Sequence, residues 1–183
     1  GEIARLKQAA RIMDEVVSEL RPMLENEPTE KQFAHALEAG VRAKGAESLG
    51  YEPTVASGPH AGSAHWEASD AVVESGAPLL LDCGALFDGY HSDMTRVIAI
   101  GDLDTQSLRM FDLILQSQAA GVAAVKAGVT GADIDRACRS VIEEKADEGW
   151  AQTFTHATGH GVGLEIHESP RISGNSSDIL LAG

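Results

Sequence analysis

The sequence predicts a mixed α/β (α+β) fold that is built as an internal duplication. Three observations support this prediction. The order helix, capped helix, strand occurs twice, the second helix of each pair opens on a threonine capping box, and the two capping threonines, Thr29 and Thr130, lie 101 residues apart. Residues 79–96, between the two occurrences, have the pattern of a β-hairpin. We therefore expect the strands of both halves to contribute to one site.

In the first half, apolar residues recur at three- and four-residue steps over residues 2–24, which predicts an amphipathic helix. A T-x-x-Q capping box at Thr29 and Gln32 opens a second helix, and Gly45 ends it. Residues 51–57 then predict a short strand. The buried stripe expected for the second helix comprises Phe33, Leu37 and Val41.

The second half repeats this order. Residues 105–126 predict a long helix, which Gly128 ends, and Thr130 with Asp133 forms a T-x-x-D capping box that opens a fourth helix. A segment rich in glycine and histidine follows over residues 153–172. The expected apolar face of the long helix comprises Leu108, Phe111, Leu115 and Val122, and that of the fourth helix comprises Ile134, Ala137, Cys138, Val141 and Ile142.

The hairpin places two carboxylates close together. Its centre is Asp88-Gly89, a dipeptide that a type I′ turn favours because both central residues need φ > 0. Counting outward from this turn, we expect Asp82 to lie opposite Thr95 and about 5 to 8 Å from Asp93, its diagonal neighbour. The residues that share this face are Asp82, Gly84, Asp93 and Thr95.

Two carboxylates this close would repel each other unless divalent cations lie between them. The spacing therefore predicts a metal pair bridged by Asp82 and Asp93, and the alternative is a pair of solvated surface carboxylates. Cys83 falls on the opposite face of the hairpin, and we expect it to be a small core residue.

Composition excludes several classes of protein. The net charge is −14 over 183 residues, and there is no cluster of Lys and Arg, so nucleic acid is not an expected partner. No apolar run reaches the ~20 residues of a membrane span, so no membrane partner is expected. The two cysteines, Cys83 and Cys138, form no disulfide framework, and we expect a cytoplasmic location.

Residues 155–170 carry three of the seven histidines, namely His156, His160 and His167. His156 and His160 have the four-residue spacing of one helical face, but the glycines between and after them disfavour a helix, and no H-E-x-x-H motif is present. A zincin-type site is therefore excluded. A glycine-flanked histidine such as His160 is typical of a residue that another backbone or a ligand approaches closely, and the alternative is a structural histidine.

Three segments resemble the pita-bread metallopeptidases, a family that includes Xaa-Pro aminopeptidases, Xaa-Pro dipeptidases (prolidases) and methionine aminopeptidases. They are LLLDCGALFDGYHSDMTR, HATGHGVGLEIHESP and, more weakly, VASGPHAGSAHW. The resemblance covers essentially the whole chain and implies the pita-bread (creatinase/aminopeptidase) fold, whose pseudo-two-fold symmetry agrees with the duplication. The Xaa-Pro branch is closer, because methionine aminopeptidases usually show a His-Gly-Ile-Pro type sequence where this chain has His65 and Trp66.

The resemblance implies a site for two divalent metal ions, with manganese favoured and cobalt or zinc as alternatives. By position, Asp82 would bind one ion, Asp93 would bridge both, and His160 would supply an imidazole. Glu168 and Thr95 would orient these ligands. The family's two remaining glutamate ligands have no counterpart in these residues.

The resemblance also implies the reaction. A metal-bridging hydroxide would attack the N-terminal peptide bond of a peptide or dipeptide, with Xaa-Pro as the expected sequence. His65 and His167 would be catalytic, by stabilising the tetrahedral intermediate or protonating the leaving nitrogen, and His156 would contact the substrate.

Because two ligands are missing, we expect residues 1–183 to form a single pita-bread catalytic domain that is truncated before its last metal-binding strands. We expect the chain to bind metal weakly, or only one ion, and to have little peptidase activity. Family members are often homodimers, so a homodimer is also expected.

The sequence is also compatible with three other functions. They are a methionine aminopeptidase, a non-catalytic pita-bread domain that binds a peptide or a partner, and a creatinase-like enzyme without metal. The presence of Asp82, Asp93 and His160 favours the metallopeptidase, because neither a binding domain nor a metal-free enzyme needs these ligands.

Overall fold

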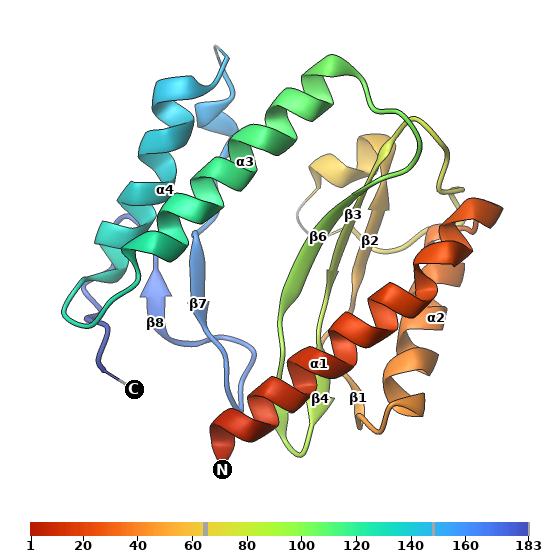
Figure 1. Ribbon diagram of the computed structural model, residues 1–183, viewed down its shortest axis with the longest axis horizontal. Coiled ribbons are helices and arrows are strands. Elements are labelled where there is room, and N and C mark those ends of the chain that lie inside the picture. The colour runs from red at the N-terminus through yellow and green to blue at the C-terminus, as the bar shows by residue number, and fades with distance from the viewer. Residues whose placement is uncertain (64–65, 148, 183) are drawn as a thin grey trace. The chain divides into compact units, whose positions relative to one another are not determined.

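The computed structural model describes residues 1–63, 66–147 and 149–182 (Figure 1). Its contacts divide the chain into two compact units. The first unit contains residues 1–104 and 162–166, and the second contains residues 105–161 and 167–183. In the described residues, no helix combines the length and apolar character needed to cross a bilayer.

The first unit begins with two helices. α1 spans Glu2–Leu20, a 3₁₀ helix follows over Arg21–Asn26, and α2 spans Glu30–Ala43 with the predicted Thr29–Gln32 capping box. The first helix is four residues shorter than predicted, because Pro22 lacks the N–H that would continue the α-helical hydrogen bonding. The strands are β1 Ser48–Leu49, β2 Thr54–Ser57, β3 Pro78–Cys83, β4 Ala85–Phe87, β5 Tyr90–His91 and β6 Met94–Ala99.

These strands form two antiparallel three-stranded sheets, in the orders β2-β3-β6 and β1-β4-β5. The predicted hairpin register is confirmed, because Phe87 pairs with Tyr90 and Asp82 pairs with Thr95. Asp88 and Gly89 have φ values of 49° and 78°, as the predicted turn requires.

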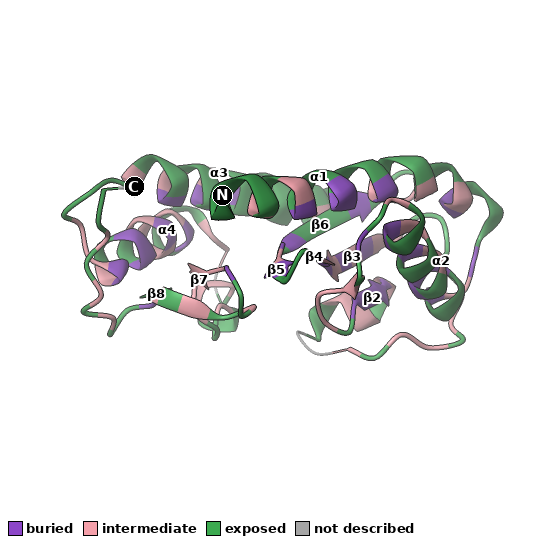
Figure 2. Cartoon of the chain, turned by 90° about the horizontal axis from the view of Figure 1, so that it is seen from below, coloured by how far each residue is buried: buried purple, intermediate pink, exposed green. Residues whose placement is uncertain are grey.

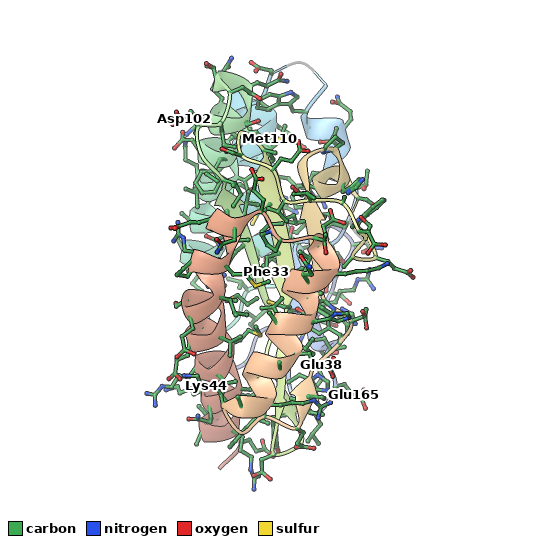
Figure 3. The ribbon with its side chains drawn as sticks, turned by 90° about the vertical axis from the view of Figure 1, so that its right-hand side faces the viewer. Phe33, Glu38, Lys44, Asp102, Met110 and Glu165 are labelled. Carbon is green, nitrogen blue, oxygen red and sulfur yellow. The ribbon has the colours of Figure 1, made fainter. Side chains whose placement is uncertain are left out.

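The core of the first unit lies between the helices and these strands. The predicted stripe of α2 is confirmed, since Phe33, Leu37 and Val41 are fully buried, and Figure 2 shows the buried positions of α1 and α2 on the sides that face the strands. Phe33 lies on the inner side of α2 (Figure 3). Cys83 is a core residue as predicted, and burial raises the pKa of its thiol to about 12.

The second unit contains α3 Thr105–Ala124, α4 Gly131–Lys145, a 3₁₀ helix at Ala151–Thr153, and the antiparallel pair β7 Gly159–Gly161 and β8 Glu168–Ile172. The capping box of Thr130 and Asp133 is present as predicted. α3 and α4 lie side by side (Figure 1).

The apolar face predicted for α3 is not its packed face. α3 instead packs on α4 through small residues: a side chain at Gly121 would meet the Cys138 sulfur at 2.3 Å, and the Ser117 hydroxyl donates to the Cys138 carbonyl. Small residues allow the two helices to approach closely, and periodicity alone could not identify them as the contact. The predicted residues Leu108, Phe111, Leu115 and Val122 are all exposed.

Each unit uses its capping threonine in the same way. Thr29 forms an antiparallel bridge with Val72, and Thr130 forms one with Ile179. The N–H groups that follow the two threonines, at Glu30 and Gly131, donate to backbone carbonyls beside these bridges, at 2.9 and 2.8 Å respectively. This shared arrangement supports the predicted duplication.

The carboxylate of Glu30, at the start of α2, is fully buried and binds four residues at the end of β2 and beyond it. It accepts hydrogen bonds from the Ser57 N–H, the Ser69 N–H and hydroxyl, the Trp66 indole and a ring nitrogen of His60. His60 and Trp66 stack with ring centroids 3.8 Å apart. Burial alone would raise the pKa of the Glu30 carboxyl. The hydrogen bonds have the larger effect in the opposite direction, so the pKa falls from 4.5 to about 2.

We predict that Glu30→Gln lowers the stability of the chain at pH 7 by roughly 3 kcal/mol, because the folded state lowers the carboxyl pKa from 4.5 to about 2. The wild-type contribution is fully present above pH 4.5 and is lost as the pH falls towards 2. Urea unfolding between pH 3 and 7 measures this difference. Glu38→Gln, an exposed position on the same helix (Figure 3), is the control, and an equal loss in both variants would contradict the prediction.

Candidate functional site

Asp82 and Asp93 converge on one hydroxyl group. The Tyr51 oxygen lies 2.7 Å from Asp82 Oδ1 and 2.9 Å from Asp93 Oδ1. A phenol has a single proton to donate, so the two carboxylates share one donor and still repel each other. The predicted face therefore exists, with both carboxylates on it.

Gly84 makes this arrangement possible. A Cβ atom at Gly84 would lie 1.8 Å from the Ser92 carbonyl oxygen and 2.8 Å from the Tyr51 ring. The Ser92 backbone and the aromatic ring of Tyr51 therefore fill the space that a side chain at this position would need. The packing fixes the ring whose hydroxyl contacts both aspartates.

Sequence reasoning missed Tyr51. It precedes β2, whose Thr54 pairs with Asp82, so its position depends on a strand pairing between distant residues that the local pattern does not specify. Burial, the hydrogen bond to Asp82 and the charges of both aspartates raise the pKa of the Tyr51 phenol. Tyr51 is therefore a neutral hydrogen-bond donor at physiological pH.

His160 and His167 lie together in the second unit. His160 is the central residue of β7 and pairs with Arg171 of β8, and its ring meets that of His167 edge-on with centroids 4.4 Å apart. A Cβ atom at Gly161 would lie 2.4 Å from the Ser169 carbonyl oxygen. The expectation that another backbone approaches the glycines around His160 closely is thus confirmed at Gly161.

Two imidazoles of the second unit, those of His160 and His156, have a defined tautomer. His160 Nδ1 lies 2.9 Å from the Gly161 carbonyl oxygen, and His156 Nδ1 lies 2.7 Å from that of Ala157. A carbonyl can only accept a hydrogen bond, so Nδ1 carries a proton in each ring. In the neutral imidazole the lone pair is then on Nε2, the state in which histidine binds a metal or accepts a proton.

The remaining predicted residues are distributed between the two units. Thr95 is exposed on β6 opposite Asp82, and Glu168 is half-buried at the start of β8. His65, predicted to be catalytic, lies outside the described residues. Asp82, Asp93 and Thr95 belong to the first unit, and His156, His160, His167 and Glu168 belong to the second.

The donor types suit divalent cations, since carboxylate oxygens and imidazole nitrogens are common ligands of Mn²⁺, Co²⁺ and Zn²⁺. Asp82 and Asp93 each place an oxygen within 3 Å of one atom, which fits a pair that shares an ion. Among the described residues, no three His, Cys, Asp or Glu side chains gather as a complete set of ligands.

Comparisons with known proteins agree with these features. Residues 4–183 match metallopeptidase family M24. The whole chain is 39% identical to the protein named uncharacterized peptidase YqhT of Bacillus subtilis and 34% identical to a Xaa-Pro dipeptidase of Pyrococcus furiosus, and in each case it covers 51% of the relative.

Solved structures give the same result. The structure of an X-Pro aminopeptidase from Thermotoga maritima matches 99% of the chain at a TM-score of 0.93 and 37% identity, and the chain covers 51% of it. The prolidase from Pyrococcus furiosus matches at a TM-score of 0.90 and 34% identity. The chain thus spans about half the length of these relatives. The predicted pita-bread fold is confirmed, and the chain belongs to metallopeptidase family M24.

Proposed function

We propose that this chain provides part of the active site of a metal-dependent peptidase that hydrolyses the N-terminal peptide bond of Xaa-Pro peptides or dipeptides. The observation that carries the proposal is the convergence of Asp82 and Asp93 on the Tyr51 hydroxyl. A binding domain would gain no stability from bringing two carboxylates together, whereas a cation removes their repulsion.

Asp82, Asp93 and His160 would hold two divalent ions, with manganese as the favoured metal. When bound, such ions polarise the peptide carbonyl and lower the pKa of water. His160, through the Nδ1 hydrogen bond to Gly161, presents the Nε2 lone pair that a ligand needs.

The other histidines would act on the substrate. His167, which packs against His160, would donate a hydrogen bond to the carbonyl oxygen or protonate the leaving nitrogen, and His65 would share this role. His156 would contact the substrate through Nε2, since its Nδ1 proton is engaged with Ala157.

Preference for proline is supported by relatives and structures that are named Xaa-Pro dipeptidase, X-Pro aminopeptidase and prolidase. We also propose a cytoplasmic location, because the two cysteines form no disulfide framework, and a homodimer, on the resemblance to the family.

Release of proline from Xaa-Pro dipeptides tests this function. The assay uses the protein as its gene encodes it, with Mn²⁺ and with a chelator, and the 183-residue chain is measured alongside. We expect chelator-sensitive turnover by the gene product that falls at least 10³-fold in Asp93→Asn, because the loss of a bridging carboxylate removes metal needed for water activation. Asp88→Asn, on the exposed turn of the same hairpin, should keep full activity. Turnover that persists in chelator would contradict the proposal.

Tyr51→Phe should weaken Mn²⁺ binding by about ten- to hundred-fold, because the phenol orients both carboxylates and outer partners of this kind typically contribute that much affinity. Calorimetric titration of the metal-free chain with Mn²⁺ measures the change. Tyr90→Phe, a buried tyrosine on the same hairpin, is the matched control and should bind as the wild type does. Unchanged affinity in Tyr51→Phe would show that the phenol only satisfies the carboxylates in the absence of metal.

A further inference from the structure

Arg139, on α4, uses all three of its guanidinium nitrogens within the second unit. Nε donates to Asp135 on the preceding turn at 2.8 Å, and the two terminal nitrogens donate to the carbonyls of Phe154 and His156 at 2.7 Å each. The guanidinium carbon also lies 4.1 Å from the centre of the Phe154 ring. One side chain thus fixes two backbone groups and one aromatic ring.

Asp135 connects Arg139 to one further residue, Thr158. Its side chain is 1% exposed, and it accepts a hydrogen bond from the Thr158 hydroxyl at 2.6 Å in addition to that from Arg139. A buried carboxylate needs such partners, so the pair couples α4 to residues 154–158. These five residues contain neither helix nor strand, and they end where β7 begins at Gly159.

His156 is the residue of this segment for which we propose a contact with the substrate. Its carbonyl accepts from Arg139, its Nδ1 donates to the Ala157 carbonyl, and its ring meets the Phe154 ring edge-on at 4.9 Å. Each of these contacts depends on the path of residues 154–158. The direction of Nε2 is therefore determined by groups that Arg139 and Asp135 hold.

We propose that Arg139 is a positioning residue that, together with Asp135, fixes the direction in which His156 presents Nε2 to the substrate. This inference rests on the proposed function for its role in catalysis. Arginine suits this geometry because its three guanidinium nitrogens donate to three different acceptors, whereas lysine has a single nitrogen from which to donate.

Long-range ¹H–¹⁵N spectra of the histidine rings test the inference without any activity measurement. In the wild type, His156 should show the Nδ1-protonated tautomer. Arg139→Lys keeps the positive charge but loses the two terminal nitrogens that bind the carbonyls of Phe154 and His156. The backbone around His156 should then be less well fixed, and the ring should shift to a mixture of both tautomers. His160 should not change, because its backbone is held by pairing with Arg171 in β8. Arg136→Lys, an exposed arginine on the same helix, is the matched control and should leave both rings unchanged.

Thr158→Val provides a second variant, which removes only the hydroxyl bond to Asp135. It should shift His156 in the same direction as Arg139→Lys, by a smaller amount, and it decides the question if Arg139→Lys does not fold. A His156 tautomer that is unchanged in every folded variant of this pair would overturn the inference. Equal shifts of His156 and His160 would also overturn it, because they would indicate a general loss of structure.

Kinetics of the gene product then test the role in substrate binding. Arg139→Lys should raise KM for an Xaa-Pro dipeptide by roughly tenfold or more while Mn²⁺ affinity stays unchanged, since a small displacement of a positioned group has effects of this size. Parallel losses of Mn²⁺ affinity and kcat would contradict a role in positioning His156. If the protein proves to have no Xaa-Pro activity, the proposed function fails, while the ring spectra still decide whether Arg139 positions His156.

Discussion

The close approach of the hairpin backbone at Gly84 is the constraint on which the first half of the site depends. With no side chain at this position, the Ser92 carbonyl and the Tyr51 ring occupy the space where a Cβ would be. The phenol is thereby held where its oxygen contacts both Asp82 and Asp93. The same contact that packs the hairpin therefore also brings together two charged groups, an arrangement that is costly without a cation and useful with one.

Both units hold a histidine-bearing segment with a buried carboxylate on the capped helix. In the first unit, Glu30 at the start of α2 accepts bonds from residues between Ser57 and Ser69. In the second, Asp135 on α4 acts with Arg139 on residues 154–158. A buried acid that is well hydrogen-bonded can hold several groups of a neighbouring segment in place. The capped helix of each unit thus anchors residues of a neighbouring segment through a buried acid.

Sequence patterns between neighbouring residues correctly predicted the hairpin turn, the hairpin register and the helix starts. The Asp88-Gly89 turn and the two-residue period of a strand were sufficient for the pairing of Asp82 with Thr95, and the capping boxes located the starts of α2 and α4. Tyr51 and Arg139 could not be found in this way, because their partners are set by tertiary packing. The exposed apolar face of α3 was mispredicted for the same reason: periodicity shows that a face is apolar but does not show what covers it.

The most direct test of the account is anomalous diffraction at the manganese edge from crystals of the chain soaked in Mn²⁺. The account predicts a peak between Asp82 and Asp93, with a carboxylate oxygen of each at roughly 2.0 to 2.2 Å. A map without a peak at these two residues at saturating Mn²⁺ would contradict it.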